Sequence, residues 1–208
     1  MNFDDIKLKF GFAEMYQIGV LNKEINKIDY LGRFVQFSNE YPNCIDLATD
    51  QSQIIGVSSV TSVATSDDPD YWFNKYSYNE LCDTYVVNKP IAFGEKKYDS
   101  ISEKAYIETR KIDPNYEPML NPEFDSKKDY VKRSLRNEWV RVTLLGKVVV
   151  HDDGTCNEGD KCKLYTGSDK DKIGFATKAT DKDIKSSSVN TYHVLCRVSK
   201  NTIMIFFK

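Results

Sequence analysis

The sequence lacks the hydrophobic stretches that direct a chain into or across a membrane. Its 208 residues contain no apolar run of roughly 18 or more, the length that a membrane-spanning helix requires. The opening segment, residues 1–10, also lacks the basic region and the apolar region of a secretory signal. We therefore expect no membrane partner and no export signal. Hydrophobic residues still make up 40% of the chain, which is enough for a folded core.

Arginine is scarce, and neither sign of charge dominates. The chain has 29 Lys and Arg against 31 Asp and Glu, and only 6 of the cations are arginine. Proteins that bind nucleic acid concentrate positive charge on one face and use arginine for bidentate contacts. Here the cations alternate with acids along most of the chain, so we expect no nucleic-acid partner.

Histidine is also scarce, which limits the enzyme classes that the chain can belong to. His151 and His193 are the only imidazoles available as a base near neutral pH, and both lie in strand-like runs typical of structural histidines. The glycine-rich loops, nucleophile elbow and zinc-binding helix of the common enzyme classes are absent from the sequence. We therefore expect no cofactor.

The five cysteines cannot all pair within one chain, and a chain of this size does not need disulfides to fold. Cys156 and Cys162 lie six residues apart, where a hairpin would bring them close together. A zinc site would need two further ligands, and only His151 is near in sequence. We therefore expect two half-buried thiols on strands and no metal site.

Short runs of β-branched and aromatic residues recur along the chain between Gly, Asn, Asp and Pro, whereas helical periodicity is scarce. This pattern predicts a mainly β fold, a compact antiparallel β-sandwich or barrel-like domain with a long irregular excursion and at most short helices. The predicted strands are residues 31–38, 44–49, 53–60, 83–87, 105–110, 139–151, 161–166, 173–178, 191–199 and 202–208.

The sequence also predicts how the chain is organised into segments. Residues 111–137 hold three prolines and many charges, which indicates a long irregular excursion over the surface. We expect an N-terminal arm over residues 1–10 and a single β-rich domain over residues 11–208. The last strand, residues 202–208, is almost entirely apolar, so we expect its own sheet or another subunit to bury it.

The carboxylates form no recognisable catalytic pair by spacing alone. Asp152 and Asp153 precede Gly154 in a sequence typical of a hairpin turn, and Gly159 follows at a second turn. We expect both glycines to adopt positive φ angles. The two aspartates are accordingly predicted to serve the turn.

Several local motifs occur in an order that resembles a known family. They are GFAE at 11–14, LNPEFD at 120–125, EWVRVTLLG at 138–146 and DDGTC at 152–156, followed by the apolar C-terminal strand. Together they resemble the C-terminal intramolecular-chaperone, or autoproteolytic cleavage, domain of phage tail spikes and pre-neck appendages, which is classed among the glutamic peptidases. The resemblance extends over nearly the whole chain, from Phe10 to Lys208.

The resemblance implies a catalytic position and a defect in it. In that family the domain follows a β-helical spike, assists its trimeric assembly and detaches by self-cleavage just before a motif whose Asp and Glu supply the chemistry. Glu14 matches the glutamate, but Gly11 stands where the family has its aspartate, and Phe10 replaces the small hydroxyl residue ahead of the cut. Peptide cleavage needs one group to activate the nucleophile and one to protonate the leaving amine. Gly11 supplies neither, so Glu14 is expected to be a catalytic remnant.

These points predict a virion structural protein, a capsid, tail or fibre component that has lost cleavage. The resemblance implies other virion proteins as partners, a homo-oligomer with a trimer as the first choice, and assembly in the host cytoplasm. Trp72 and Phe206 are candidate interface anchors. One alternative is an active self-processing glutamic peptidase in which a non-adjacent acid, such as Asp4 or Asp5, assists Glu14. Another is a chaperone for trimeric fibres that acts in trans.

Overall fold

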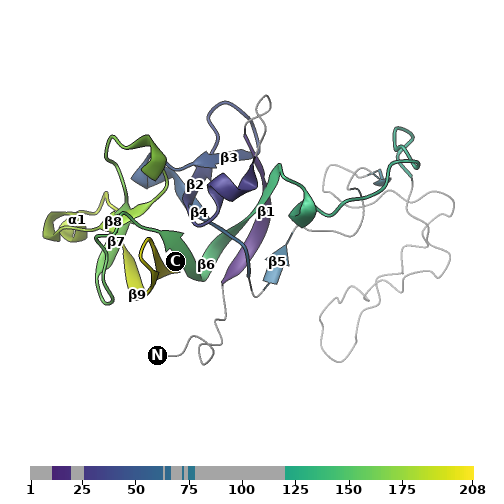
Figure 1. Ribbon diagram of the computed structural model, residues 1–208. Coiled ribbons are helices and arrows are strands. Elements are labelled where there is room, and N and C mark those ends of the chain that lie inside the picture. The colour runs from purple at the N-terminus through teal and green to yellow at the C-terminus, as the bar shows by residue number, and fades with distance from the viewer. Residues whose placement is uncertain (1–10, 20–25, 63, 67–71, 73–74, 78–119) are drawn as a thin grey trace, which may run out of the picture. The chain divides into compact units, whose positions relative to one another are not determined.

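The computed structural model describes residues 11–19, 26–62, 64–66, 72, 75–77 and 120–208 (Figure 1). The chain divides into two compact units, unit 1 with residues 1–69 and 131–208 and unit 2 with residues 70–130. The excursion expected over residues 111–137 therefore runs across the boundary between the units. A single domain over residues 11–208 stays a prediction.

Unit 1 is built mainly from β-strands, which confirms the predicted fold class. The ten strands form one sheet in the order β5-β1-β3-β2-β4-β6-β10-β9-β7-β8. Most neighbours pair antiparallel, but β1 pairs parallel with both β3 and β5. The strands are β1 (Phe12–Ile18), β2 (Phe34–Phe37), β3 (Cys44–Leu47), β4 (Ile54–Ser59), β5 (Ala64–Ser66), β6 (Trp139–His151), β7 (Lys161–Leu164), β8 (Ala176–Lys178), β9 (Tyr192–Ser199) and β10 (Thr202–Phe207).

Five of these strands pair in a closed circuit. β1 pairs with β3, β3 with β2, β2 with β4 and β4 with β6, and β6 returns to pair with β1. The circuit encloses a hydrophobic cluster of five fully or almost fully buried side chains. These are Ile18, Val35, Ile45, Val140 and Val142.

The long strand β6 connects this circuit to the rest of unit 1, as Figure 1 shows. Its first half contributes Val140 and Val142 to the circuit cluster, and its second half contributes Val148 and Val150 to a second, larger cluster. β10 pairs with the second half of β6 on one side and with β9 on the other. One strand therefore belongs to both hydrophobic clusters.

The C-terminal strand β10 is buried by its own sheet, which is one of the two arrangements expected from the sequence, the other being burial by another subunit. Four of its six side chains are buried, whereas Phe206 is 40% exposed. Phe207 stacks on Tyr192 with ring centroids 5.0 Å apart, and Tyr192 stacks in turn on Phe34. Aromatic packing thus fixes the chain end in the larger cluster.

Helices are few and short in the described residues. The α-helix α1 (Asp181–Lys185) begins with a capping box in which Thr180 and Asp183 satisfy each other's backbone N–H groups. No helix in the described part of the chain is long and apolar enough to cross a membrane. The 3-10 helices are η2 (Lys27–Tyr30), η3 (Gln51–Gln53), η5 (Arg133–Leu135) and η6 (Lys170–Lys172).

In unit 2, Trp72 contacts described residues of the same unit. The Trp72 ring packs edge-on against Tyr130 with centroids 5.2 Å apart, and its Nε1–H donates to the Lys128 carbonyl oxygen at 3.2 Å. Tyr76 forms a β-bridge with Leu120. Trp72 is therefore part of a local packing arrangement within this unit.

Most of the strand predictions are confirmed within one to three residues at each end, and residues 139–151 match β6. Strand β1 and strand β5 were not predicted. The strands expected over residues 83–87 and 105–110 lie outside the described residues. The irregular character of the excursion is confirmed for residues 120–137, which contain the short η5 and no strand.

Candidate functional site

The motif that carries Glu14 lies on β1, between two other strands. Glu14 is opposite Val142 of β6 in the antiparallel pairing and opposite Ser66 of β5 in the parallel pairing. Directly opposite residues of an antiparallel pair share a face of the sheet, so Glu14 shares its face with a member of the circuit cluster. The structure thus places this carboxylate on a strand at the border of a hydrophobic cluster.

The partner of the Glu14 carboxylate in the described part of the chain is a phenol. The Tyr16 hydroxyl donates a hydrogen bond of 2.9 Å to Glu14 Oε2. The Tyr16 ring in turn packs edge-on against Phe37 with centroids 6.0 Å apart. Tyr16 therefore orients Glu14, a role that the sequence analysis did not assign. Its position two residues away on the same strand, hence on the same face, was the available signal.

Gly11 lies where the backbone of β6 leaves no room for a side chain. A Cβ atom built on Gly11 would lie 1.8 Å from the carbonyl oxygen of Leu145. A Cβ built on Gly146 would lie 2.8 Å from the Cα of Gly11. Contacts this short between a Cβ and backbone do not occur in folded proteins, so an aspartate cannot occupy this position with the backbone as it stands.

The amide of Gly11 is also fixed. Its N–H donates a 3.0 Å hydrogen bond to the carbonyl oxygen of Lys147, and Gly11 is buried. This N–H belongs to the peptide bond between residues 10 and 11, the bond that the resemblance implies as the cleavage site. The nitrogen that would leave as an amine is thus held in β-sheet hydrogen bonding. Asp4 and Asp5, considered as substitute acids, lie outside the described residues.

The DDGTC segment is organised around a buried carboxylate. The Asp152 side chain is fully buried and forms a bidentate ion pair with Arg197, with Nη1–Oδ1 and Nη2–Oδ2 distances of 3.1 and 3.0 Å. Asp152 Oδ2 also accepts hydrogen bonds from the N–H groups of Gly154 and Cys156. The hydrogen bond to Asp152 raises the pKa of Arg197.

Asp153 completes the turn from the exposed side. It accepts hydrogen bonds from the hydroxyls of Thr155 at 2.6 Å and Thr177 at 2.7 Å. Gly154 and Gly159 have φ angles of +92° and +83°. The predicted turn role of both aspartates and the positive φ of both glycines are confirmed. The contribution of Arg197 was not predicted, because it lies on β9, far away in sequence.

Cys156 and Cys162 belong to the same hydrophobic cluster, but β6 and β7 do not pair as a hairpin, and the burial of the thiols differs from the prediction. Both are fully buried in the larger hydrophobic cluster, and only Cys162 lies on a strand. The expectation of half-buried strand thiols is therefore corrected, because Cys156 is drawn into the core by the turn that Asp152 organises. No group of three or more metal-capable side chains lies together in the described residues.

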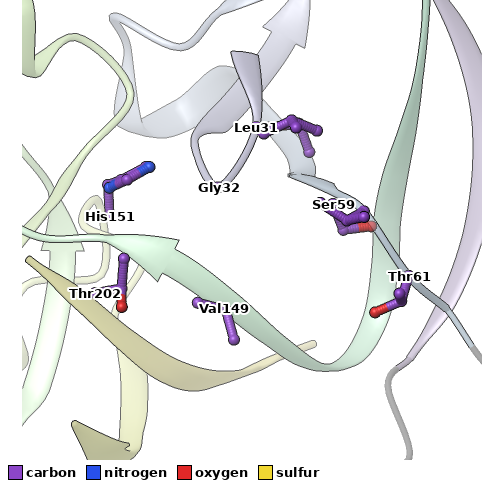
Figure 2. A pocket seen from close by; sticks show the side chains of 9 residues that line it. Leu31, Gly32, Ser59, Thr61, Val149, His151 and Thr202 are labelled. Atoms are coloured by element: carbon purple, nitrogen blue, oxygen red, sulfur yellow. The ribbon is translucent and has the colours of Figure 1, made fainter. Parts of the chain in front are cut away.

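His151 lines a shallow pocket of about 280 Å³ (Figure 2). In this view His151 and Thr202 lie on one side, and Ser59 and Thr61 lie on the other. The imidazole stacks on Phe175 with centroids 5.1 Å apart. Burial, and then the positive charge of Arg33, lower the pKa of His151. A neutral stacked imidazole agrees with the structural role predicted for it.

His193 is exposed on β9, as its alternation with core residues indicated. It lies opposite Phe206 of β10 and Lys161 of β7. His151 lies at the far end of β6, nine residues beyond Val142, which is opposite Glu14, and His193 lies on β9, which does not pair with β1. The described residues bring no imidazole into hydrogen-bond contact with that carboxylate.

Comparison with known proteins gives a family match over most of the chain. Residues 10–193 match the family described as Peptidase_G2, IMC autoproteolytic cleavage domain. The preneck appendage protein of Bacillus phage PZA is 39% identical over 61 residues, which cover 29% of this chain and 7% of that protein. The putative phage-related protein YobO of Bacillus subtilis (strain 168) is 27% identical over 141 residues, which cover 66% of this chain and 14% of that protein.

Two solved structures of bacteriophage phi29 gene product 12 have a similar fold. The structure of the pre-mature protein matches with a TM-score of 0.60 at 20% identity, over 96% of this chain and 21% of that one. The structure of its C-terminal fragment matches with a TM-score of 0.57 at 21% identity, over 95% of this chain and 99% of the fragment. The chain therefore corresponds in fold to one C-terminal domain and spans a small part of the curated relatives' length.

Proposed function

Because the chain belongs to the Peptidase_G2 family of IMC autoproteolytic cleavage domains, we propose that it is a structural component of a bacteriophage particle that keeps the domain's fold and has lost its cleavage. Relatives named as appendage proteins of Bacillus phages support the particle role. The fold of a phage C-terminal fragment over 95% of the chain supports the retained scaffold.

The observation that carries the loss of cleavage is the position of Gly11. Self-cleavage by the family's chemistry needs two acidic groups, since one carboxylate cannot activate a nucleophile and protonate the leaving amine at the same moment. The position that matches the family's aspartate is closed by the Leu145 carbonyl, 1.8 Å from where a Cβ would lie. Glu14 remains, and its carboxylate accepts a hydrogen bond from the Tyr16 phenol.

Intact-mass spectrometry tests this proposal. The chain is expressed with an N-terminal affinity tag, so that a cut between residues 10 and 11 releases the tag together with residues 1–10. We expect full-length mass after prolonged incubation, both for the native sequence and for Glu14→Gln. Loss of the tagged segment from the native sequence but not from Glu14→Gln would instead show a working peptidase that uses Glu14.

We further propose that the particle component is a homo-oligomer, with a trimer as the first choice. Three apolar side chains are exposed on neighbouring strand positions: Phe12 at 60%, Leu145 at 48% and Phe206 at 40%. Phe12 lies opposite Leu145, and Phe206 lies opposite Lys147, two residues further along β6. Such a contiguous apolar surface is typical of an interface core.

Light scattering tests the oligomer. We expect Phe206→Asp to shift the mass of the assembly toward that of the monomer. The matched control is Ile184→Asp, since Ile184 is equally exposed at 41% but lies on α1. A monomeric native chain would contradict the oligomer, and an unchanged oligomer in Phe206→Asp would contradict the surface.

A chaperone that acts in trans is the second candidate function, and the closed position at Gly11, which leaves the fold intact without cleavage, is compatible with it. Co-expression with phage fibre chains separates the two functions. A rise in the yield of trimeric fibre without incorporation of this chain would favour the chaperone. Its stable incorporation into the assembled particle would favour the structural component.

A further inference from the structure

Two buried thiols of unit 1 have no role in the proposed function. Cys156 and Cys162 are each 0% exposed and belong to the same hydrophobic cluster. The interaction with Cys156 is the largest cause of the raised pKa of Cys162, so the two thiols lie close together in that cluster. We propose that Cys156 and Cys162 form an oxidisable dithiol, which closes to an intrachain disulfide by exchange with a small-molecule disulfide such as glutathione disulfide.

The backbone around the pair holds the two cysteines in place. The loop between them is tied to β9, because Gly159 N–H donates to the Val194 carbonyl at 3.0 Å and Val194 N–H donates to the Asp160 carbonyl at 2.9 Å. Cys156 is anchored by its N–H, which donates to Asp152 at 3.2 Å, and Cys162 by its place on β7. A disulfide requires backbones that are already close, and the tight turn over residues 157–160, closed by the Asp160 N–H to the Asn157 carbonyl at 3.1 Å, turns the chain back between the two cysteines.

The Arg197 guanidinium closes the other side of the loop. It donates to the carbonyl oxygen of Cys156 and forms the bidentate pair with Asp152. These bonds fix the backbone of Cys156 and leave its side chain directed into the cluster that contains Cys162. The pair is therefore a product of the same turn that the DDGTC segment builds.

The exchange has a defined order of steps. The hydrogen bond to Cys156, burial and the nearby Asp152 raise the pKa of Cys162, which keeps its proton. In this scheme Cys156 attacks first: its sulfur displaces one glutathione thiolate and its proton goes to solvent, which gives a mixed disulfide. Cys162 then loses its proton to solvent and attacks the sulfur of Cys156, which releases the second glutathione. The two protein thiols lose two electrons, and glutathione disulfide gains them.

Burial sets the condition under which this happens. Glutathione disulfide reaches the sulfurs only when the 157–161 loop opens locally, so exchange follows the opening of that loop. A reducing cytoplasm keeps such a pair as thiols, whereas an oxidising exterior favours the disulfide. If the chain is a particle component, which rests on the proposed function, the pair closes once the particle leaves its host.

The experiment incubates the purified full chain under native conditions in glutathione buffers from fully reduced to fully oxidised. Free thiols are then blocked, and peptides are mapped by mass spectrometry. We expect a peptide that links Cys156 to Cys162 and a mass lower by two hydrogen atoms. We also expect a midpoint of thermal unfolding a few degrees higher than that of the reduced chain.

Two variants and one condition make the result decisive. Cys196→Ala, which removes a partly exposed thiol on β9, should leave the link intact, and Cys156→Ala should abolish it. If Cys156→Ala does not fold, peptide mapping of the native chain remains the test. A native chain without the link in the fully oxidised buffer, or a link that forms only in denaturant, would overturn the proposal. Neither result bears on cleavage or particle assembly, which separates this proposal from the proposed function.

Discussion

The backbones of Gly11 and Gly146 face each other at the N-terminal end of β1. A Cβ on Gly146 would lie 2.8 Å from the Cα of Gly11, and a Cβ on Gly11 would lie 1.8 Å from the carbonyl oxygen of the neighbouring Leu145. The two backbones approach closely only because neither residue has a side chain. Gly11, which the resemblance aligns with the family's aspartate, is thus also a packing requirement.

Substitution of Gly11 should therefore destabilise the fold. We expect Gly11→Ala to lower the free energy of unfolding by about 3 kcal/mol or more, because the added methyl group forces β1 away from β6. Gly154→Ala is the control, since nothing lies within 4 Å of a Cβ there and only its φ of +92° is unfavourable, at roughly 1–2 kcal/mol. Urea denaturation measures both, and equal losses would contradict the close approach.

Gly11→Asp should not restore self-cleavage. The aspartate meets the same backbone oxygen as alanine does, so we expect its loss of stability to be at least as large. Intact mass after incubation is the measurement, on the tagged chain described above. Release of residues 1–10 from a folded Gly11→Asp chain would show that the backbone can move enough to rebuild the catalytic pair.

Removal of the Tyr16 hydroxyl should affect stability slightly. Tyr16→Phe eliminates the hydrogen bond to Glu14 Oε2 but keeps the ring against Phe37. We expect a loss of about 0.5–1.5 kcal/mol in the free energy of unfolding. In Glu14→Gln the amide oxygen still accepts this bond, so a smaller loss is expected. A larger loss in Glu14→Gln would indicate a further interaction of the carboxylate charge.

Asp152 should be the most sensitive acid of the described chain. Asp152→Ala removes the ion-pair partner of Arg197 and leaves the N–H groups of Gly154 and Cys156 without their acceptor, whereas Arg197 keeps backbone carbonyl acceptors. Because Arg197 is partly exposed, we expect a cost of about 1–3 kcal/mol, below that of a fully buried pair. Asp153→Ala, at the next position, removes only bonds at the exposed side of the turn and should cost less. Thermal unfolding of both variants checks the difference, and equal costs would contradict it.

The start of α1 should respond to acid. Hydrogen bonds from Lys163, at 2.7 Å, and from Thr180 lower the pKa of Asp183 to about 2. A depressed folded-state pKa means that this carboxylate stabilises the fold above its unfolded pKa of about 3.9. That contribution is lost as the pH falls from about 4 through 2. The difference in unfolding free energy between the native chain and Asp183→Asn should vanish over this range, and a constant difference would contradict the assignment.

Local patterns predicted most of the strands and turns, and tertiary contacts explain what they missed. The alternating apolar run at residues 139–151 and the glycine turns at Gly154 and Gly159 carry their own signal. The sequence of β1 has no such pattern. This strand pairs with three others and is partly buried on both faces, so its buried residues Ala13, Met15 and Ile18 do not alternate with a period of two.

The candidate site at Gly11 and Glu14 stays a prediction from the motif, and its structural surroundings were not predicted. Gly11 and Glu14 were identified from the motif, whereas the Leu145 carbonyl that closes the Gly11 position lies more than a hundred residues away in the chain. The same holds for Arg197, whose contact with Asp152 depends on the pairing of β9 and β10. Such long-range relations follow from strand order and register, which no single motif encodes.

Because β6 belongs to both hydrophobic clusters, we expect unit 1 to unfold as a whole. Val140 and Val142 pack in one cluster and Val148 and Val150 in the other, along one uninterrupted strand. Unfolding of either half of the strand would expose apolar surface of the other half to water. Partial unfolding would therefore gain little conformational entropy and would lose much of the free energy of apolar burial. The amides of β6 should consequently exchange with deuterium at one common slow rate from end to end, as in a single cooperative unit.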